Sequence, residues 1–368
     1  MPFRWSRSRP VLRGFIDLVD PARVVGWGAH DDGIAPELTV LVDGQQVGRI
    51  TPTLRRTDLE ALFPNNINLG FCFRMAQPLT GDATIAVVDR FGHHLSKSPY
   101  RFYLPNAGSD PRYDMRLPAP SNALDIFQGQ WSAAIPGFGY GTAMLTESPH
   151  VRFFEQQIGG FSGKRILELG PLEASHTYTM SKAGAAHILA IEANKNAFLK
   201  CLIVQELLAI ENADFLLGDF YKYLTSSPPR FDAILASGVL YHMADPLGLI
   251  EGATRASDSI GVWTHYFDAE RIRSRSDLSE KFDSSSQIVS FHGRTIDRHT
   301  QRYLDATEWA GFCGGSSPTS VWLTKEGILS AFDSLGFEVV VGQDEPDHPN
   351  GPAFSFVARK RRARVSEP

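Results

Sequence analysis

The chain has 368 residues, of which 43% are hydrophobic and 21% charged, and its formal net charge is −5. This length exceeds one ordinary core, so we expect two domains. The mild negative charge excludes a general attraction to nucleic acid or an anionic membrane, and no stretch approaches the ~20 apolar residues of a membrane helix. The start lacks a signal-peptide layout, and Cys72, Cys201 and Cys313 form no zinc or redox pair. We therefore expect a cytoplasmic protein. The sequence does not indicate its oligomeric state.

Residues 11–104 are expected to form an all-β sandwich that acts as an accessory module. The β-prone runs are Val24–Trp27, Leu38–Val42, Gln46–Ile50, Phe71–Met75 and Thr84–Val88. Asp43-Gly44 lies between two of them and predicts a tight hairpin, because glycine tolerates the positive φ that such turns require. Strands at this spacing, with little helical periodicity, are typical of a β-sandwich. Residues 105–121 have the composition of a linker.

Residues 122–360 alternate between strand and helix patterns. The expected strands are Arg165–Leu169, His187–Glu192, Asp214–Leu217, Phe231–Ala236, Ile260–His265, Phe337–Val341 and Ala353–Ala358. The last two leave no room for a helix between them, so they predict a terminal antiparallel hairpin. The pattern as a whole predicts an α/β domain with a Rossmann-like seven-stranded sheet. An insertion at about 268–322 is expected to form a lid over the substrate.

Three successive strands end in acidic residues. The first runs into Glu168-Leu169-Gly170-Pro171, where Gly170 lets the backbone approach a ligand closely. The second ends in Glu192, which can accept hydrogen bonds from both hydroxyls of a ribose. The third is followed by Asp219-Phe220, which offers an acceptor to an adenine amine and an apolar face to its ring. Each acid alone could cap a helix, but three in order favour a nucleoside site.

These residues resemble class I S-adenosylmethionine-dependent methyltransferases, from about Asp125 to Ala358. The resemblance makes residues 168–171 the first cofactor motif, Glu192 the ribose acid and Asp219 the adenine-side acid. A terminal antiparallel hairpin is specific to this methyltransferase variant. The fourth-strand segment, residues 231–246, resembles the branch that includes tRNA wobble-uridine carboxymethyltransferases. It implies that Ser237 and Gly238 lie at the cofactor and Tyr241 on the substrate side.

The loop after the first strand departs from the family pattern. Leu172 and Ala174 occupy positions that usually hold glycines. A dinucleotide would need those glycines, because its pyrophosphate sits on backbone amides, and Glu173 would repel it. S-adenosylmethionine has no phosphate, so the loop favours the methyl donor as cofactor. Trp131, in the aromatic segment before the first strand, is a candidate wall for the methionine end.

Oxygen acceptors usually need a general base or a metal. His242 follows the fourth strand, and His265 and Asp268 lie at the same end of the fifth, so these three are the candidate catalytic residues. His292 and Arg294, in the insertion, are candidate substrate contacts. His242 could equally hold its loop by hydrogen bonds. The spacing of His265 and Asp268 alone does not establish a metal site, so none is assigned.

The front module resembles small β-sandwiches found beside bacterial glycosyltransferases, through Val25-Gly-Trp-Gly28 and the Asp43-Gly44 hairpin. This favours a glycan or sugar-bearing small molecule as the acceptor. Two alternatives remain open. One is an RNA-modifying enzyme, which the net charge and the lack of a basic stripe disfavour. The other is a catalytically silent binding protein whose altered loop no longer takes the cofactor.

Overall fold

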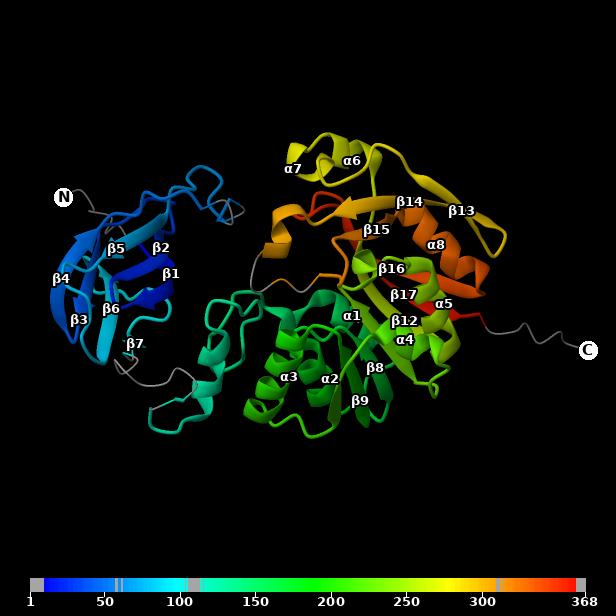
Figure 1. The fold of residues 1–368 in the computed structure, drawn as a ribbon, viewed down its shortest axis with the longest axis horizontal. Coiled ribbons are helices and arrows are strands. Elements are labelled where there is room, and N and C mark those ends of the chain that lie inside the picture. Colours follow the sequence, from blue (N-terminus) through cyan, green and yellow to red (C-terminus); the bar gives the residue numbers. More distant parts are fainter. Residues whose placement is uncertain are drawn as a thin grey trace, which may run out of the picture. The chain divides into compact units, whose positions relative to one another are not determined.

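A computed structural model of the protein describes residues 10–56, 59–60, 62–102, 104, 113–114, 116–308, 312 and 314–361. The chain divides into two compact units, Met1–Ala119 and Pro120–Pro368 (Figure 1). Cys313 and residues 105–112 of the expected linker lie outside the described residues. Within those residues, no helix combines the length and apolar character needed to cross a bilayer.

The N-terminal unit contains two antiparallel sheets that share one core. The first has the order β1 (Leu12–Asp20), β2 (Arg23–His30), β5 (Gly70–Arg74), and the second β4 (Gln45–Ile50), β3 (Leu38–Val42), β6 (Ala83–Asp89), β7 (Tyr100–Phe102). Ile16 and Phe71 from one sheet and Leu38 and Ile85 from the other belong to a single buried cluster. Strands β1 and β7 were not predicted from the sequence.

The hairpin between β3 and β4 turns at Asp43 and Gly44, whose φ values are 48° and 79°. Two positive φ values in a two-residue loop match the twist of the flanking strands. Trp27 is half-buried against Phe63, with ring centroids 6.0 Å apart. Its indole therefore contributes to the packing of the unit.

The C-terminal unit is built on a Rossmann-like, mostly parallel sheet. Its order is β10 (Ala213–Leu217), β9 (His187–Glu192), β8 (Arg165–Leu169), β11 (Ala233–Ser237), β12 (Ser259–His265), β17 (Ala353–Lys360), β16 (Phe337–Glu345). Strand β17 runs antiparallel to both β12 and β16, as the sequence predicted. The chain order reverses on either side of β8, and in such sheets ligands bind beyond the carboxyl ends of the strands at that point.

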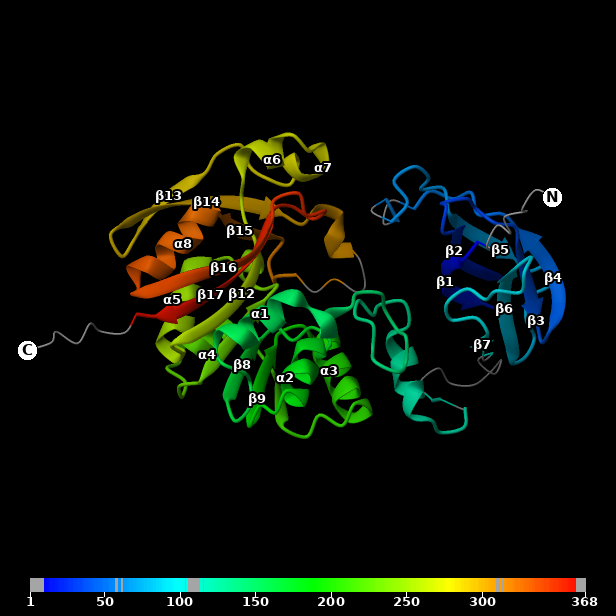
Figure 2. The same cartoon turned by 180° about the vertical axis from the view of Figure 1, so that it is seen from behind.

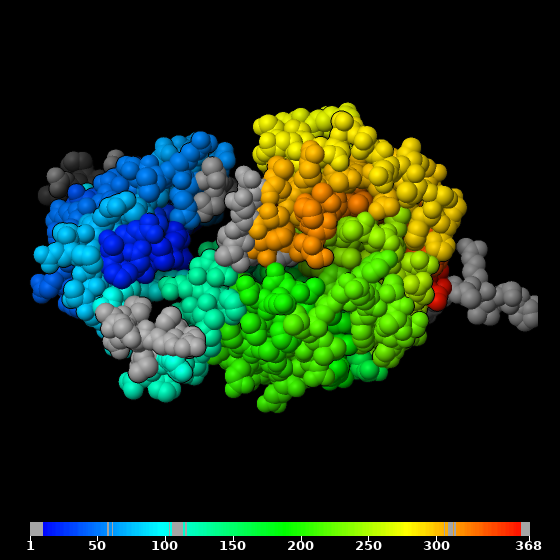
Figure 3. Space-filling model, viewed as in Figure 1, coloured from blue at the N-terminus to red at the C-terminus, as the bar shows by residue number. Residues whose placement is uncertain are grey.

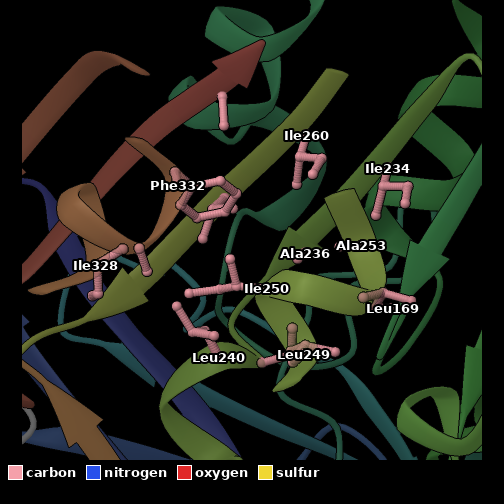
Figure 4. Packing of buried hydrophobic residues seen from close by; sticks show 14 of the residues in the cluster. Leu169, Ile234, Ala236, Leu240, Leu249, Ile250, Ala253, Ile260, Ile328 and Phe332 are labelled. Atoms are coloured by element: carbon pink, nitrogen blue, oxygen red, sulfur yellow. The ribbon is translucent and has the colours of Figure 1, made fainter. Parts of the chain in front are cut away.

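Two buried clusters cover opposite faces of this sheet. Helices α1 (Pro149–Gln157), α2 (Ser175–Lys182) and α3 (Lys195–Leu207) pack on one face. Helices α4 (Phe220–Thr225), α5 (Pro246–Ala256) and α8 (Lys325–Ser334) pack on the other. In Figure 4, Ile250 of α5 and Phe332 of α8 meet Ile260 of the sheet. Alternate strand residues such as Ile166 and Leu167 enter different clusters, as the pleat requires.

The insertion has secondary structure of its own. It contains α6 (Ala269–Arg273), α7 (Ser276–Ser279), β13 (Gln287–Phe291), β14 (Arg294–Arg302), the 3₁₀ turn η5 (Leu304–Glu308) and β15 (Thr319–Leu323). Strands β13, β14 and β15 form an antiparallel sheet (Figure 2). Val321 donates its N–H to the carbonyl of Met243 (2.9 Å), just after the 3₁₀ turn η4 (Leu240–His242). Figure 3 shows this region, yellow to orange, above the green first half of the unit.

Candidate active site

The ends of neighbouring strands are joined by backbone hydrogen bonds. Gly170 N donates to Ile191 O (3.0 Å), and Gly218 N to Glu192 O (2.9 Å). Gly170 has φ +63°, and a Cβ placed on it would lie 2.7 Å from Val239 Cγ1 and 3.9 Å from Phe220 Cε1. The turns after β8, β10 and β11 thus converge on a glycine that leaves no room for a side chain.

Two variants separate the cost of the positive φ at Gly170 from the cost of its close contact with Val239. We expect Gly170→Ala to lower the free energy of unfolding by more than the about 1–2 kcal/mol that a left-handed φ costs an L-residue, because the new methyl group also meets Val239. The matched control is Gly159→Ala, which has φ +75° but open space around it. Denaturant unfolding should show a smaller loss for the control. Equal losses would show that Val239 yields and that the close approach at Gly170 is unimportant.

In the loop from Gly170 to Ala174, two residues adopt the positive φ that glycine favours, although neither is a glycine. Leu172 and Ala174 have φ values of 57° and 58°, in the region that non-glycine residues adopt at a cost. The surrounding structure must therefore hold this conformation. Glu173, between the two, provides that support.

Glu173 is 1% exposed and faces inward, which corrects the expectation that its charge would repel a pyrophosphate. Its carboxylate accepts the amides of Ser132 (3.0 Å) and Ala133 (2.7 Å) and pairs with Lys200 Nζ at 2.8 Å. Lys200 is 4% exposed and also donates to the carbonyl of Gln130. This buried ion pair ties the loop to α3 and to residues 130–133.

Trp131 lies within the same arrangement and is buried. Its Nε1 donates to the Leu124 carbonyl (2.8 Å), and its ring meets Phe127 and Tyr140 edge-on. The indole is committed to packing, so we no longer assign it to the wall of a cofactor site.

Two of the three predicted acids are buried at the strand ends. Glu168 accepts a hydrogen bond from Thr177 Oγ1 (2.5 Å), and burial raises its pKa to about 7. Glu192 accepts the amide of Leu172 on one oxygen (3.2 Å) and that of Asn194 on the other (2.8 Å). Burial raises the pKa of Glu192, and these amides oppose the shift. An ionised carboxylate offers about four acceptor positions, so Glu192 keeps capacity for a ligand's hydroxyls.

Asp219 is exposed and caps α4. Its carboxylate accepts the amides of Tyr221 (2.9 Å) and Lys222 (3.3 Å). For this acid the helix-cap interpretation is therefore correct, and a role toward adenine would have to use its remaining acceptor positions. Phe220, beside it, does lie near Gly170.

Beyond β11 and β12 lies a cluster of aromatic rings and imidazoles. Tyr241 contacts His265 edge-on at 4.5 Å between centroids, and His265 stacks on Trp322 at 5.1 Å with an interplanar angle of 4°. The ring centroid of His265 also lies 5.1 Å from those of Trp263 and His348, and the Trp263 and His348 centroids are 5.7 Å apart. His265 Nδ1 faces the carbonyl oxygens of Gly351 (2.8 Å) and Pro352 (3.3 Å).

His242 lies beside this cluster, 4.1 Å from the ring of Tyr241. Its Nδ1 is hydrogen-bonded to Tyr303 OH (2.7 Å), which accepts the amide of Gly315 (3.1 Å). Burial lowers the pKa of His242 to about 3. These contacts hold the insertion against η4, which is a structural role for His242.

The insertion also reaches the other side of the strand ends. Asn194 caps α3 through Oδ1 and donates Nδ2 to the carbonyl of Phe312 (3.0 Å). Gly315 packs so closely on His242 that a Cβ there would lie 2.5 Å from its carbonyl oxygen. The described part of the insertion therefore contacts the turns after both β9 and β11.

Three predicted residues are engaged elsewhere. Asp268 caps α6 by accepting the amides of Glu270 and Arg271, both at 3.0 Å. His292, in the turn between β13 and β14, lies 3.5 Å from Glu251 of α5, and Arg294 pairs with Asp333 of α8 at 2.6 Å. These contacts give Asp268, His292 and Arg294 structural roles, and their catalytic and substrate roles stay predictions. No group of three His, Cys, Asp or Glu side chains in the described residues could hold a metal ion.

Sequence reasoning missed two histidines near these strand ends, His150 and His348, and named His176 only as a residue lining the loop after β8. His150, at the start of α1, is hydrogen-bonded through Nε2 to Ser237 Oγ (2.9 Å) and stacks on Trp263. His176 meets His150 edge-on at 5.3 Å, and His348 lies in the β16–β17 turn. Their positions in the sequence carry no motif, so only the folded chain reveals that they meet Ser237 and His265.

No family model matches this sequence, and no curated protein matches it. Among solved structures, the N-terminal domain of EvdMO1 with SAH bound is 23% identical, with coverage of 66% of this chain and 95% of that one and a TM-score of 0.49. The same domain in the presence of SAH and D-fucose is 23% identical, with coverages of 61% and 87% and a TM-score of 0.45. Magnesium protoporphyrin IX methyltransferase (ChlM) from Synechocystis PCC 6803 with bound SAH is 13% identical, with coverages of 66% and 96% and a TM-score of 0.41.

Proposed function

We propose that the chain is an S-adenosylmethionine-dependent methyltransferase that acts on a hydroxyl oxygen of a carbohydrate or sugar-bearing acceptor. The observation that carries the proposal is the convergence of Gly170, Glu192 and the turn after β11 at the point where the strand order reverses. The residues fit the cofactor: Gly170 leaves a close approach that a Cβ would fill, and Glu192 offers free acceptor positions for ribose hydroxyls.

Each side of the site has a distinct task. When bound, S-adenosylmethionine supplies an electrophilic methyl group. Glu192 would hold the ribose, and Ser237, which ends β11 and is hydrogen-bonded to His150, would lie beside the cofactor. The aromatic rings around Tyr241 and Trp263 exclude water and orient the acceptor, which is the main requirement of an in-line methyl transfer.

His265 is the residue that we assign to proton transfer. Its Nδ1 faces only carbonyl oxygens, which cannot donate, so Nδ1 carries the hydrogen and Nε2 is unprotonated in the neutral ring. Burial lowers its pKa to about 4, so the ring is neutral throughout the physiological range. Nε2 would take the proton from the acceptor hydroxyl as the methyl group passes from the cofactor's sulfur to the oxygen, and would then release that proton to solvent.

Cofactor binding is tested by calorimetry on the full chain with S-adenosylmethionine. We expect Glu192→Gln to raise the Kd about 10- to 100-fold, since hydrogen bonds to a charged group contribute about 1.5–3 kcal/mol. The matched control is Glu211→Gln, which removes the same charge from an exposed position before β10 and should leave the Kd unchanged. No heat at millimolar ligand would overturn the enzyme assignment in favour of a silent fold.

The acceptor class is tested separately, by following a labelled methyl group from S-adenosylmethionine into a panel of sugars and sugar-bearing compounds. We expect labelled methyl ethers to form. Transfer to RNA but to none of these compounds would contradict the carbohydrate assignment and leave the cofactor assignment intact.

A further inference from the structure

His348 takes part in none of the steps above, yet it lies against the proposed base. It belongs to the turn between β16 and β17, and its ring centroid is 5.1 Å from that of His265 and 5.7 Å from that of Trp263. The insertion holds this turn in place. Arg275 donates to the carbonyls of His348 (3.1 Å) and Pro349 (2.5 Å).

The hydrogen bonds of the two imidazoles fix opposite tautomers. His265 Nδ1 donates to the Gly351 carbonyl, so its Nε2 carries a lone pair. His348 Nδ1 accepts the amide of Asn350 (3.2 Å), so its Nε2 carries the hydrogen. Among the described residues, no hydrogen bond reaches either Nε2. One imidazole therefore presents an acceptor and its neighbour a donor.

Both rings are uncharged at neutral pH. Burial lowers the pKa of His265, and the neighbouring His348 lowers it further. Burial also lowers the pKa of His348. Arg275 adds to that shift, and Glu345 opposes it. The other rings that contact His265 are those of Trp263, Tyr241 and Trp322. The Trp322 indole nitrogen is buried without a partner in the described residues. Arg275, the cation that acts on His348, is paired with Asp277 at 2.7 Å, so an anionic acceptor would find no uncompensated charge on these rings.

We propose that His265 and His348 together bind two neighbouring hydroxyl groups of an uncharged, polyhydroxylated acceptor. His265 Nε2 accepts from the hydroxyl to be methylated, and His348 Nε2–H donates to the hydroxyl beside it. The inference rests on the proposed methyl transfer and makes His348 the residue that selects the position of transfer. The flat rings of Trp263, Tyr241 and Trp322 suit the C–H face of a sugar ring, and they offer no partner to a carboxylate.

The tautomers can be measured without any ligand. Long-range ¹H–¹⁵N spectra of the protein with ¹⁵N-labelled histidine distinguish Nδ1–H from Nε2–H, with His265→Asn and His348→Phe used for assignment. We expect Nδ1–H for His265 and Nε2–H for His348 at pH 7. The opposite tautomer in either ring, or a doubly protonated ring, would overturn the proposal.

Ligand selection is tested on the SAH-saturated protein with D-fucose and D-galacturonate, which share ring stereochemistry and differ by a methyl group or a carboxylate at C6. We expect D-fucose to shift the ¹⁵N signals of both histidines, and D-galacturonate to bind at least tenfold more weakly. His348→Phe should weaken D-fucose binding about tenfold, His348→Gln should restore part of the loss, and neither should change the Kd for SAH.

Three results would overturn the inference: no shift with D-fucose at 50 mM (about fifty times a 1 mM Kd), equal binding of both sugars, or unchanged D-fucose binding in His348→Phe. In each case SAH binding measured on the same samples shows whether the proposed function still stands. If the wild-type chain did not bind SAH, the proposed function itself would be wrong.

Discussion

Replacing His265 by Asn should reduce turnover by about 10²- to 10⁴-fold, the range that a positioned general base contributes. The Asn amide can still donate to the Gly351 carbonyl as Nδ1 does, so the turn should stay in place while the proton acceptor at Nε2 is lost. The measurement is kcat with the acceptor found by the labelled-methyl screen, together with the Kd for SAH, which should not change.

The matched control is His187→Asn. His187 begins β9, at the opposite end of the strands, and pairs with Asp214 on the surface, so its loss should not affect turnover. The pH profile gives a second check. Since the pKa of His265 is lowered to about 4, the base is already unprotonated at neutral pH, and activity should fall only below about pH 5. Full turnover in His265→Asn, or a midpoint near 6.5 that this variant abolishes, would contradict the assignment.

Glu173→Ala should lower the free energy of unfolding by about 3–5 kcal/mol. The substitution leaves Lys200 as a buried charge without its partner and removes the acceptor for the amides of Ser132 and Ala133. Breaking one side of a buried pair is costly for this reason. Denaturant unfolding of the full chain measures the loss.

The double variant Glu173→Ala/Lys200→Met separates charge from packing. Removing both partners eliminates the unpaired ammonium, so we expect it to recover a large part of the stability. The SAH affinity of the single variant should also fall, because the left-handed turn at Leu172 and Ala174 loses its anchor. A loss of less than 1 kcal/mol in Glu173→Ala would show that the pair does not hold the loop.

The strand pattern of the C-terminal unit could be predicted from sequence because buried parallel strands are short apolar runs with turn residues at their ends. Strand Arg165–Leu169 was predicted with the bounds that the structure shows, and the terminal hairpin was predicted in kind. Gly170 and Glu192 could be predicted as cofactor contacts for the same reason: Gly170 directly follows one of those runs and Glu192 ends another. The left-handed backbone of Leu172 and Ala174, at positions that usually hold glycines, was not predicted.

Long-range pairing accounts for the contacts that the sequence did not predict. Nothing local distinguishes Glu173, which pairs with Lys200, from an acid that faces a ligand. An Asp before a helix is ambiguous between cap and catalyst, and Asp219 and Asp268 are both caps. His292 and Arg294 were expected at the site because the insertion was treated as one lid. Its sheet instead sets them beside α5 and α8, while Trp322 reaches His265.

A crystal structure of the full chain grown with SAH would show whether the cofactor binds at the ends of β8 and β9. We expect both ribose hydroxyls to lie within hydrogen-bond distance of the Glu192 carboxylate, the backbone of Gly170 to touch the ligand, and the sulfur to face Tyr241 and His265. Ligand bound away from Glu192, or strand ends that stay empty at a saturating concentration, would contradict this expectation.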